Sequence, residues 1–222
     1  MERITFHYIS HEIFHFFSHI EKGFVFTSLH MIYDPGRTIK NFIDGKRKKY
    51  QPPVSYFLIW TTIYILFLLG LEKYFGENMV INYKEYFGPA ATTKFAISHL
   101  SFVLTVVIPF QALYLYALVT KNVFNYFESM VAAIYSLGTI ILFQFVFAVF
   151  ALLLHLAGSL QVDLRFSDSF KILYLVWFIA DFIKLFPVKL KFPRAVLFLI
   201  LAFGTFTLWR LYGVPAFLNW IE

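Results

Sequence analysis

Five apolar segments constrain this chain more than any other feature of its sequence. Each approaches the roughly 20 apolar residues that an α-helix needs to cross a bilayer. They cover residues 54–71, 100–120, 130–154, 172–186 and 195–212. A segment within lipid must satisfy its backbone hydrogen bonds internally, so each is expected to be helical. The sequence therefore predicts an all-α, polytopic helical membrane protein with about five transmembrane helices.

The composition also indicates a lipid environment. Apolar residues make up 59% of the 222 residues and charged residues 14%, whereas a soluble domain has about 25% charged residues. Aromatic residues account for 22% of the chain, and lipid-facing helices and interfacial belts accommodate such an excess. The absence of cysteine excludes disulfides, thiolate metal sites and cysteine nucleophiles.

The basic residues predict an orientation, because cytoplasmic loops are enriched in Lys and Arg. With the N-terminus inside, thirteen of the 19 basic residues fall on the inner side and six on the outer side. We therefore expect a multi-pass protein of the cell (inner) membrane with a cytoplasmic N-terminus and an external C-terminus. Within the last two segments, Asp181 and Lys184 are expected to pair, and Arg210 to reach the interface. Short basic runs beside apolar segments indicate topology and anionic lipid contacts, so no nucleic-acid partner is expected.

The chain divides into a cytoplasmic or interfacial amphipathic region, residues 1–53, and a five-helix transmembrane domain, residues 54–222. Apolar residues recur at helical spacing in the first part of this region, which predicts an interfacial amphipathic helix. Two short helices are expected after it, at 27–32 and 38–43. Asp34-Pro35-Gly36 ends the first of these and Asp44-Gly45 the second.

Histidines recur every four residues near the N-terminus, at His7, His11, His15 and His19. Three interpretations remain open. The imidazoles can lie at the headgroup level, they can sense pH near 6, or they can bind metal.

The metal interpretation rests on His11-Glu12-x-x-His15, in which two histidines on one helical face ligate zinc and the glutamate acts as the catalytic base. His19 lies about 12 Å along the helix from His11, too far to share one ion. A third ligand must then come from elsewhere, and the candidates are Glu128 first, then His30 and Asp34. Asn125-x-x-Glu128 resembles the later helix of membrane zinc proteases.

A basic cluster precedes the first span and consists of Arg37, Lys46, Arg47, Lys48 and Lys49. It is either a positive-inside anchor or a site for a lipid phosphate or another anion, which an arginine fork and lysine charges can bind.

Polar residues inside the apolar segments normally face a partner or a hydrated cavity. Gln111, Gln144 and Asp181 therefore outline a polar pathway along spans two to four. Pro109 is expected to kink the second span and to free a carbonyl that Gln111 or Gln144 could satisfy.

Several motifs occur in a fixed order: the histidine segment with Glu21-Lys22-Gly23, then Thr27, Pro35-Gly36-Arg37-Thr38-Ile39, Gly45-Lys46-Arg47 and Pro52. On these residues the chain resembles a bacterial membrane family catalogued as domain of unknown function number 3667. Asn125-Tyr126-x-Glu128 is similar to its later motif. This chain has no cysteine ribbon of the kind that many members carry. The five-span layout is also similar to that of Yip-type membrane proteins. The resemblance implies that these motifs belong together on the cytoplasmic side, and it implies no activity.

The sequence thus favours a non-enzymatic membrane protein, an oligomeric channel, transporter or membrane effector with the histidine and basic residues as a regulatory cluster. Membrane lipids and further copies of the chain are its expected partners. One alternative is a zinc-dependent membrane hydrolase, and another is a membrane assembly or trafficking scaffold.

Metal analysis of purified protein separates these functions. If the chain is a zinc hydrolase, the wild-type protein holds stoichiometric zinc, and His11→Ala or His15→Ala removes it because each deletes a ligand. A wild-type protein without zinc, or variants with unchanged zinc content, would sink the hydrolase hypothesis.

Overall fold

The computed structural model describes residues 23–76, 80–82, 86–87, 89–158, 160–185 and 192–221, and most of them are helical. A first described helix covers Gly23–Tyr33. The following elements are α2 (Pro35–Ile43), η1 (Arg47–Lys49), α3 (Pro53–Phe75), β1 (Ile81–Asn82), α4 (Ala90–Ser98), α5 (Leu100–Thr105), α6 (Ile108–Tyr114), η2 (Leu115–Thr120), α7 (Tyr126–Gly158), β2 (Val162–Asp163), η3 (Leu164–Phe166), α8 (Ser167–Leu185), α9 (Phe192–Leu208), η4 (Trp209–Gly213) and α10 (Val214–Ile221). The predicted all-α class is confirmed.

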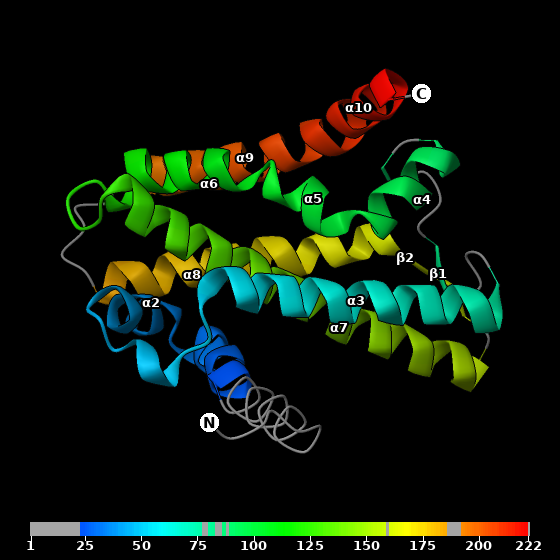
Figure 1. Cartoon of the computed structure of the whole chain (residues 1–222), viewed down its shortest axis with the longest axis horizontal. Helices are drawn as coiled ribbons and strands as arrows, with labels where there is room; N and C mark the ends of the chain where they lie inside the picture. Colours follow the sequence, from blue (N-terminus) through cyan, green and yellow to red (C-terminus); the bar gives the residue numbers. More distant parts are fainter. Residues whose placement is uncertain are drawn as a thin grey trace, which may run out of the picture.

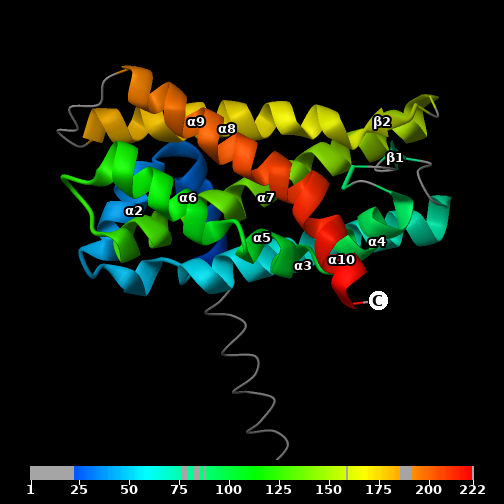
Figure 2. The same ribbon diagram turned by 90° about the horizontal axis from the view of Figure 1, so that it is seen from above.

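The long helices lie lengthwise beside one another and form a bundle (Figure 1). α7 is its centre, because it packs against α3, α6 and α8. α2 lies at one end of the bundle, whereas the short parallel pair β1–β2 lies at the other, as Figure 2 also shows. α10 packs against α4 and extends toward the strand end.

Among the described residues, four helical segments are long and apolar enough to cross a membrane: Arg47–Phe75, Leu100–Thr120, Tyr126–Gly158 and Phe192–Trp220. They correspond to the predicted spans 54–71, 100–120, 130–154 and 195–212, so the chain is a membrane protein. The prediction of five apolar spans is corrected at 172–186. α8 does form there and packs against α7 and α9. Its acidic and basic residues near both ends keep it out of the apolar set.

The predicted short helices before the bundle are confirmed with longer bounds. Pro35 is the first residue of α2, where its fixed φ suits a helix start. Asp44 ends the helix, and Gly45 follows with a φ of 90°, a left-handed conformation that favours glycine. The chain therefore turns sharply before the basic residues of η1.

The second span is interrupted at the point where Pro109 predicted a kink. α5 ends at Thr105 and α6 begins at Ile108, and the Val107 N–H bonds to the Leu104 carbonyl at 3.0 Å instead of the Val103 carbonyl. The Val103 carbonyl accepts a hydrogen bond from the Trp209 indole N–H at 2.8 Å. The carbonyl that Pro109 leaves without a donor is a different one, that of Thr105, and its pairing with Gln111 or Gln144 stays a prediction.

α3 and α7 approach closely at Gly138. A Cβ atom at this position would lie 2.7 Å from a ring carbon of Tyr56 and 3.2 Å from the Cα of Phe57. The Tyr56 hydroxyl and the Thr139 hydroxyl are hydrogen bonded at 3.2 Å across the same contact. The missing side chain of Gly138 therefore lets the two helices meet, as small residues do at helix interfaces in membranes.

We predict that Gly138→Ala lowers the free energy of unfolding by about 1 to 3 kcal/mol, because the methyl group overpacks the contact with Tyr56. The measurement is thermal unfolding in a mild detergent. Gly70→Ala is the matched control, since a Cβ at Gly70 meets nothing within 4 Å. Equal midpoints for the two variants would contradict this account of the α3–α7 contact.

Candidate functional site

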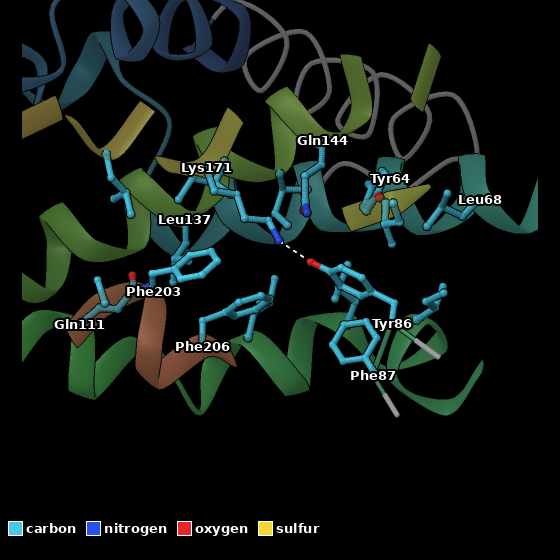
Figure 3. A pocket seen from close by; sticks show the side chains of 18 residues that line it. Tyr64, Leu68, Tyr86, Phe87, Gln111, Leu137, Gln144, Lys171, Phe203 and Phe206 are labelled. Carbon is cyan, nitrogen blue, oxygen red and sulfur yellow. Dashed lines mark hydrogen bonds between the residues drawn. The ribbon is translucent and has the colours of Figure 1, made fainter. Parts of the chain in front are cut away.

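A cavity of about 40 Å³ lies inside the bundle, between α3, α6, α7, α8 and α9. Most of its lining is apolar, but polar side chains reach it from four helices and from the α3–α4 connection. Figure 3 shows these side chains, which are Tyr64, Tyr86, Gln111, Gln144 and Lys171. The cavity has room for a few water molecules.

Lys171 is the charged group of this cavity, and its side chain is 8% exposed. Its ammonium lies 2.6 Å from Oδ1 of Asp168, one helical turn earlier, and donates to the Tyr86 hydroxyl at 2.7 Å. It also lies 4.4 Å from the centre of the Phe206 ring. One ion pair, one hydrogen bond and the faces of two aromatic rings, Tyr86 and Phe206, therefore hold this buried cation in the first turn of α8.

Arg210 enters the same cluster from the π-helix η4. One guanidinium nitrogen donates to Oδ2 of Asp168 at 3.1 Å, and the guanidinium lies 4.3 Å from the Tyr86 ring centre. Its Nε is buried and has no hydrogen-bond partner among the described residues. The expectation that Arg210 reaches the interface is therefore wrong, because the side chain is drawn inward by Asp168.

Tyr86 completes the cluster as a neutral group. Burial raises the pKa of its hydroxyl well above the ordinary value, and the negative charge of Asp168 raises it further. The hydroxyl stays protonated and donates to Asp168 Oδ1 at 2.7 Å. Lys171 and Arg210 thus share one carboxylate, and the cluster formed by Tyr86, Asp168, Lys171 and Arg210 has a net charge of about +1 at neutral pH.

Sequence reasoning missed this cluster. From the sequence, Arg210 is expected at the interface, and neither Asp168 nor Lys171 is singled out. The available signal was Asp168-x-x-Lys171 at the start of an apolar helix, together with Arg210 inside another apolar segment. Charged groups in such positions normally pair inside the protein.

Two of the three residues of the predicted polar pathway lie together in the structure, and the third lies elsewhere. Gln111 and Gln144 are buried and line the cavity. Asp181 does not line it; its Oδ2 accepts a hydrogen bond from the Gly36 backbone N–H at 2.8 Å, at the α2 end of the bundle. Lys184 lies 5.3 Å from the Trp177 ring centre, and the described ion pairs do not join it to Asp181.

Glu128 forms a capping box with Asn125 at the start of α7. Its carboxylate accepts from the Asn125 N–H at 2.8 Å, and the Asn125 side chain accepts from the Glu128 N–H at 2.9 Å. His11, Glu12 and His15 lie outside the described residues. In the described part of the chain, no group of three or more His, Asp or Glu side chains could hold a metal ion. The zinc site stays a prediction.

The residues proposed to bind anions lie around α2 and η1. Arg37 pairs with Asp34 at 3.1 Å, and Lys46 donates to the Asn41 side chain at 3.2 Å. Arg47 lies 5.4 Å from the Phe42 ring centre. Lys48 and Lys49 are exposed. Their role toward lipid or another anion also stays a prediction.

Residues 21–65 match a family model described as "Protein of unknown function (DUF3667)". Over this segment the chain is similar to that family. The match confirms the resemblance drawn from the motifs and covers less than half of the chain. No curated protein and no solved structure is detectably similar to the chain.

Several motif residues of the DUF3667 segment attach it to the bundle. The Thr27 hydroxyl donates to the Gly23 carbonyl at 2.7 Å and accepts from the Gln51 N–H at 2.8 Å. The Gln51 carbonyl accepts from the Tyr135 hydroxyl at 2.6 Å. Gly36 lies so close to α8 that a Cβ would be 3.0 Å from Asp181. Thr27 therefore holds the connection before α3 in place, Gln51 joins the segment to α7, and Gly36 joins it to α8.

We predict that Asp168→Ala lowers the free energy of unfolding by roughly 3 kcal/mol, because it leaves Lys171 and Arg210 without their shared carboxylate. Asp44→Ala is the control, since Asp44 forms an ion pair with Lys40 in which both side chains are 44% exposed, and it is expected to cost less than about 1 kcal/mol. Both are measured by thermal unfolding in detergent. A loss at Asp168 no larger than that at Asp44 would contradict the described cluster.

Proposed function

We propose that this membrane protein is a channel or transporter whose solute path includes the cavity at Lys171. The observation that carries the proposal is the convergence of Gln111, Gln144 and Lys171, from three different helices, on one cavity. Ionisable and amide groups are costly within a membrane and normally mark a solute pathway or a proton relay.

The state of the Tyr64 hydroxyl adds support. Tyr64 lines the cavity, and its hydroxyl is buried without a hydrogen-bond partner among the described residues. A buried hydroxyl without a partner is unfavourable. Water or solute in the cavity would satisfy it, as is expected of a hydrated compartment.

The interrupted second span also suits a transport function. α6 begins next to the break and carries Gln111 to the cavity. In many transporters, discontinuous helices near the middle of the membrane form the substrate site. A helix interrupted at Val106 and Val107 can change its direction at lower cost than a continuous helix can.

The α2 end of the bundle is proposed to be cytoplasmic. The basic residues Arg37, Lys46, Arg47, Lys48 and Lys49 belong to this end, and the connection between η2 and α7, with Lys121, lies there too (Figure 1). This accumulation of positive charge agrees with the positive-inside rule. The same residues are proposed to bind anionic lipid of the inner membrane and to regulate the path.

The test is transport by the purified protein reconstituted in liposomes. We expect ion flux or conductance in wild-type protein and a reduction of about tenfold or more in Gln111→Leu/Gln144→Leu, because each substitution removes a polar group from the path. Gln161→Leu is the control, since Gln161 is exposed beside β2 and outside the cavity lining. Circular dichroism and the size of the detergent-solubilised particle, which also reports the expected homo-oligomer, verify folding.

Absence of flux and conductance from folded wild-type protein across a range of pH would overturn the transport proposal. Bound zinc in that sample would then favour the hydrolase alternative. A stoichiometric copurifying protein without zinc would favour the scaffold.

A further inference from the structure

We propose that the cavity binds a small monovalent anion of halide size, with the Lys171 ammonium as its principal ligand. The transport of that anion rests on the proposed function, whereas its binding does not. The inference begins with the net charge of about +1 in the cluster of Tyr86, Asp168, Lys171 and Arg210, where two cations share one carboxylate. A buried excess of charge is unfavourable unless a counterion accompanies it.

Hydrogen-bond donors remain available at the cavity. An ammonium has three donors, and Lys171 uses two of them, toward Asp168 and Tyr86. The buried Tyr64 hydroxyl is a further donor without a partner among the described residues. The amide groups of Gln111 and Gln144 can donate as well. All of these donor side chains line the cavity, and Figure 3 shows Gln111 at one side of it, beside Phe203.

The carboxylate oxygens beside Lys171, in contrast, are already engaged. Oδ1 of Asp168 accepts from both Tyr86 and Lys171, and Oδ2 accepts from Arg210. No carboxylate, that of Asp168 included, belongs to the described lining of the cavity. A metal cation or an ammonium ligand would therefore meet the Lys171 ammonium and no carboxylate in this lining, so the site selects against cations.

The volume restricts the anion to a small one. About 40 Å³ of space corresponds to a few water molecules, which a halide can replace. Lipid headgroups and organic acids with larger bodies do not fit this space. The surrounding leucines and isoleucines raise the strength of a charge–charge contact by excluding water.

Aromatic rings offset part of the positive charge without removing the need for a ligand. Phe206 lies 4.4 Å from the Lys171 ammonium, and Tyr86 lies 4.3 Å from the Arg210 guanidinium. A ring face attracts a cation but accepts hydrogen bonds poorly. The donors described above consequently still favour an anion.

The binding test is the thermal unfolding midpoint of the full chain in detergent, titrated with sodium bromide against sodium gluconate at equal ionic strength. A ligand that binds only the folded state raises the midpoint in a saturable way. We expect this rise with bromide and not with gluconate, and its loss in Lys171→Met. Lys184→Met is the control, because Lys184 is exposed near the opposite end of α8, and it should keep the bromide effect.

Tyr64→Phe provides a second variant that keeps every charge of the cluster. It removes one donor from the cavity and is expected to raise the bromide dissociation constant about tenfold. A midpoint that ignores bromide in wild-type protein, or that responds equally in Lys171→Met, would overturn the inference. If Lys171→Met does not fold, an unchanged bromide dissociation constant in Tyr64→Phe would overturn the inference.

Flux measurements separate this inference from the transport proposal. Saturable bromide binding without any flux would leave the anion site standing and remove the transport function. Cation-selective flux without bromide binding would support the transport function and remove the anion site. Anion-selective flux that Lys171→Met abolishes would support both.

Discussion

At Gly138, α7 comes so close to α3 that a ring carbon of Tyr56 occupies the place of a side chain. This contact fixes the helix around which the others assemble. α7 is buried along much of its length and touches α3, α6 and α8. Because lipid offers no hydrophobic driving force between helices, close packing of this kind and interhelical hydrogen bonds must hold them together. The Tyr56–Thr139 and Tyr135–Gln51 hydrogen bonds lie in the same region.

At the β1–β2 end of the bundle, the contacts between elements include a buried charged cluster. Asp168 joins α8, the α3–α4 connection and η4 through Lys171, Tyr86 and Arg210. Burying three charged groups is costly, and polar partners on the carboxylate offset that cost. The same arrangement leaves positive charge and unused donors beside the cavity. Stability and binding capacity therefore arise from one set of residues.

Much of the fold could be predicted from residue patterns within short segments. Apolar runs predicted the long helices, and Asp34-Pro35-Gly36 and Asp44-Gly45 predicted where the short helices end. Pro109 predicted the interruption of the second span. The ordered motifs predicted a resemblance to the DUF3667 family, and the match over residues 21–65 confirmed it.

The candidate site could be predicted only in part. Gln111 and Gln144 were identified as buried polar groups, but their relation to Lys171 depends on how α6, α7 and α8 pack. Asp168 and Arg210 are 42 residues apart, and no local pattern specifies that they meet. Trp209 as the partner of the Val103 carbonyl is a contact of the same kind, across 106 residues. Tertiary packing decides such pairs, and a single sequence does not record it.

Trp209 and Arg210 are neighbours in the π-helix η4, yet they bond in two directions. Trp209 holds the Val103 carbonyl beside the interruption between α5 and α6, whereas Arg210 holds the carboxylate of Asp168. One turn of π-helix thus contacts both the interruption in the second span and the charged cluster at Asp168. A displacement of this turn would disturb both hydrogen bonds, because the two side chains share one short stretch of backbone.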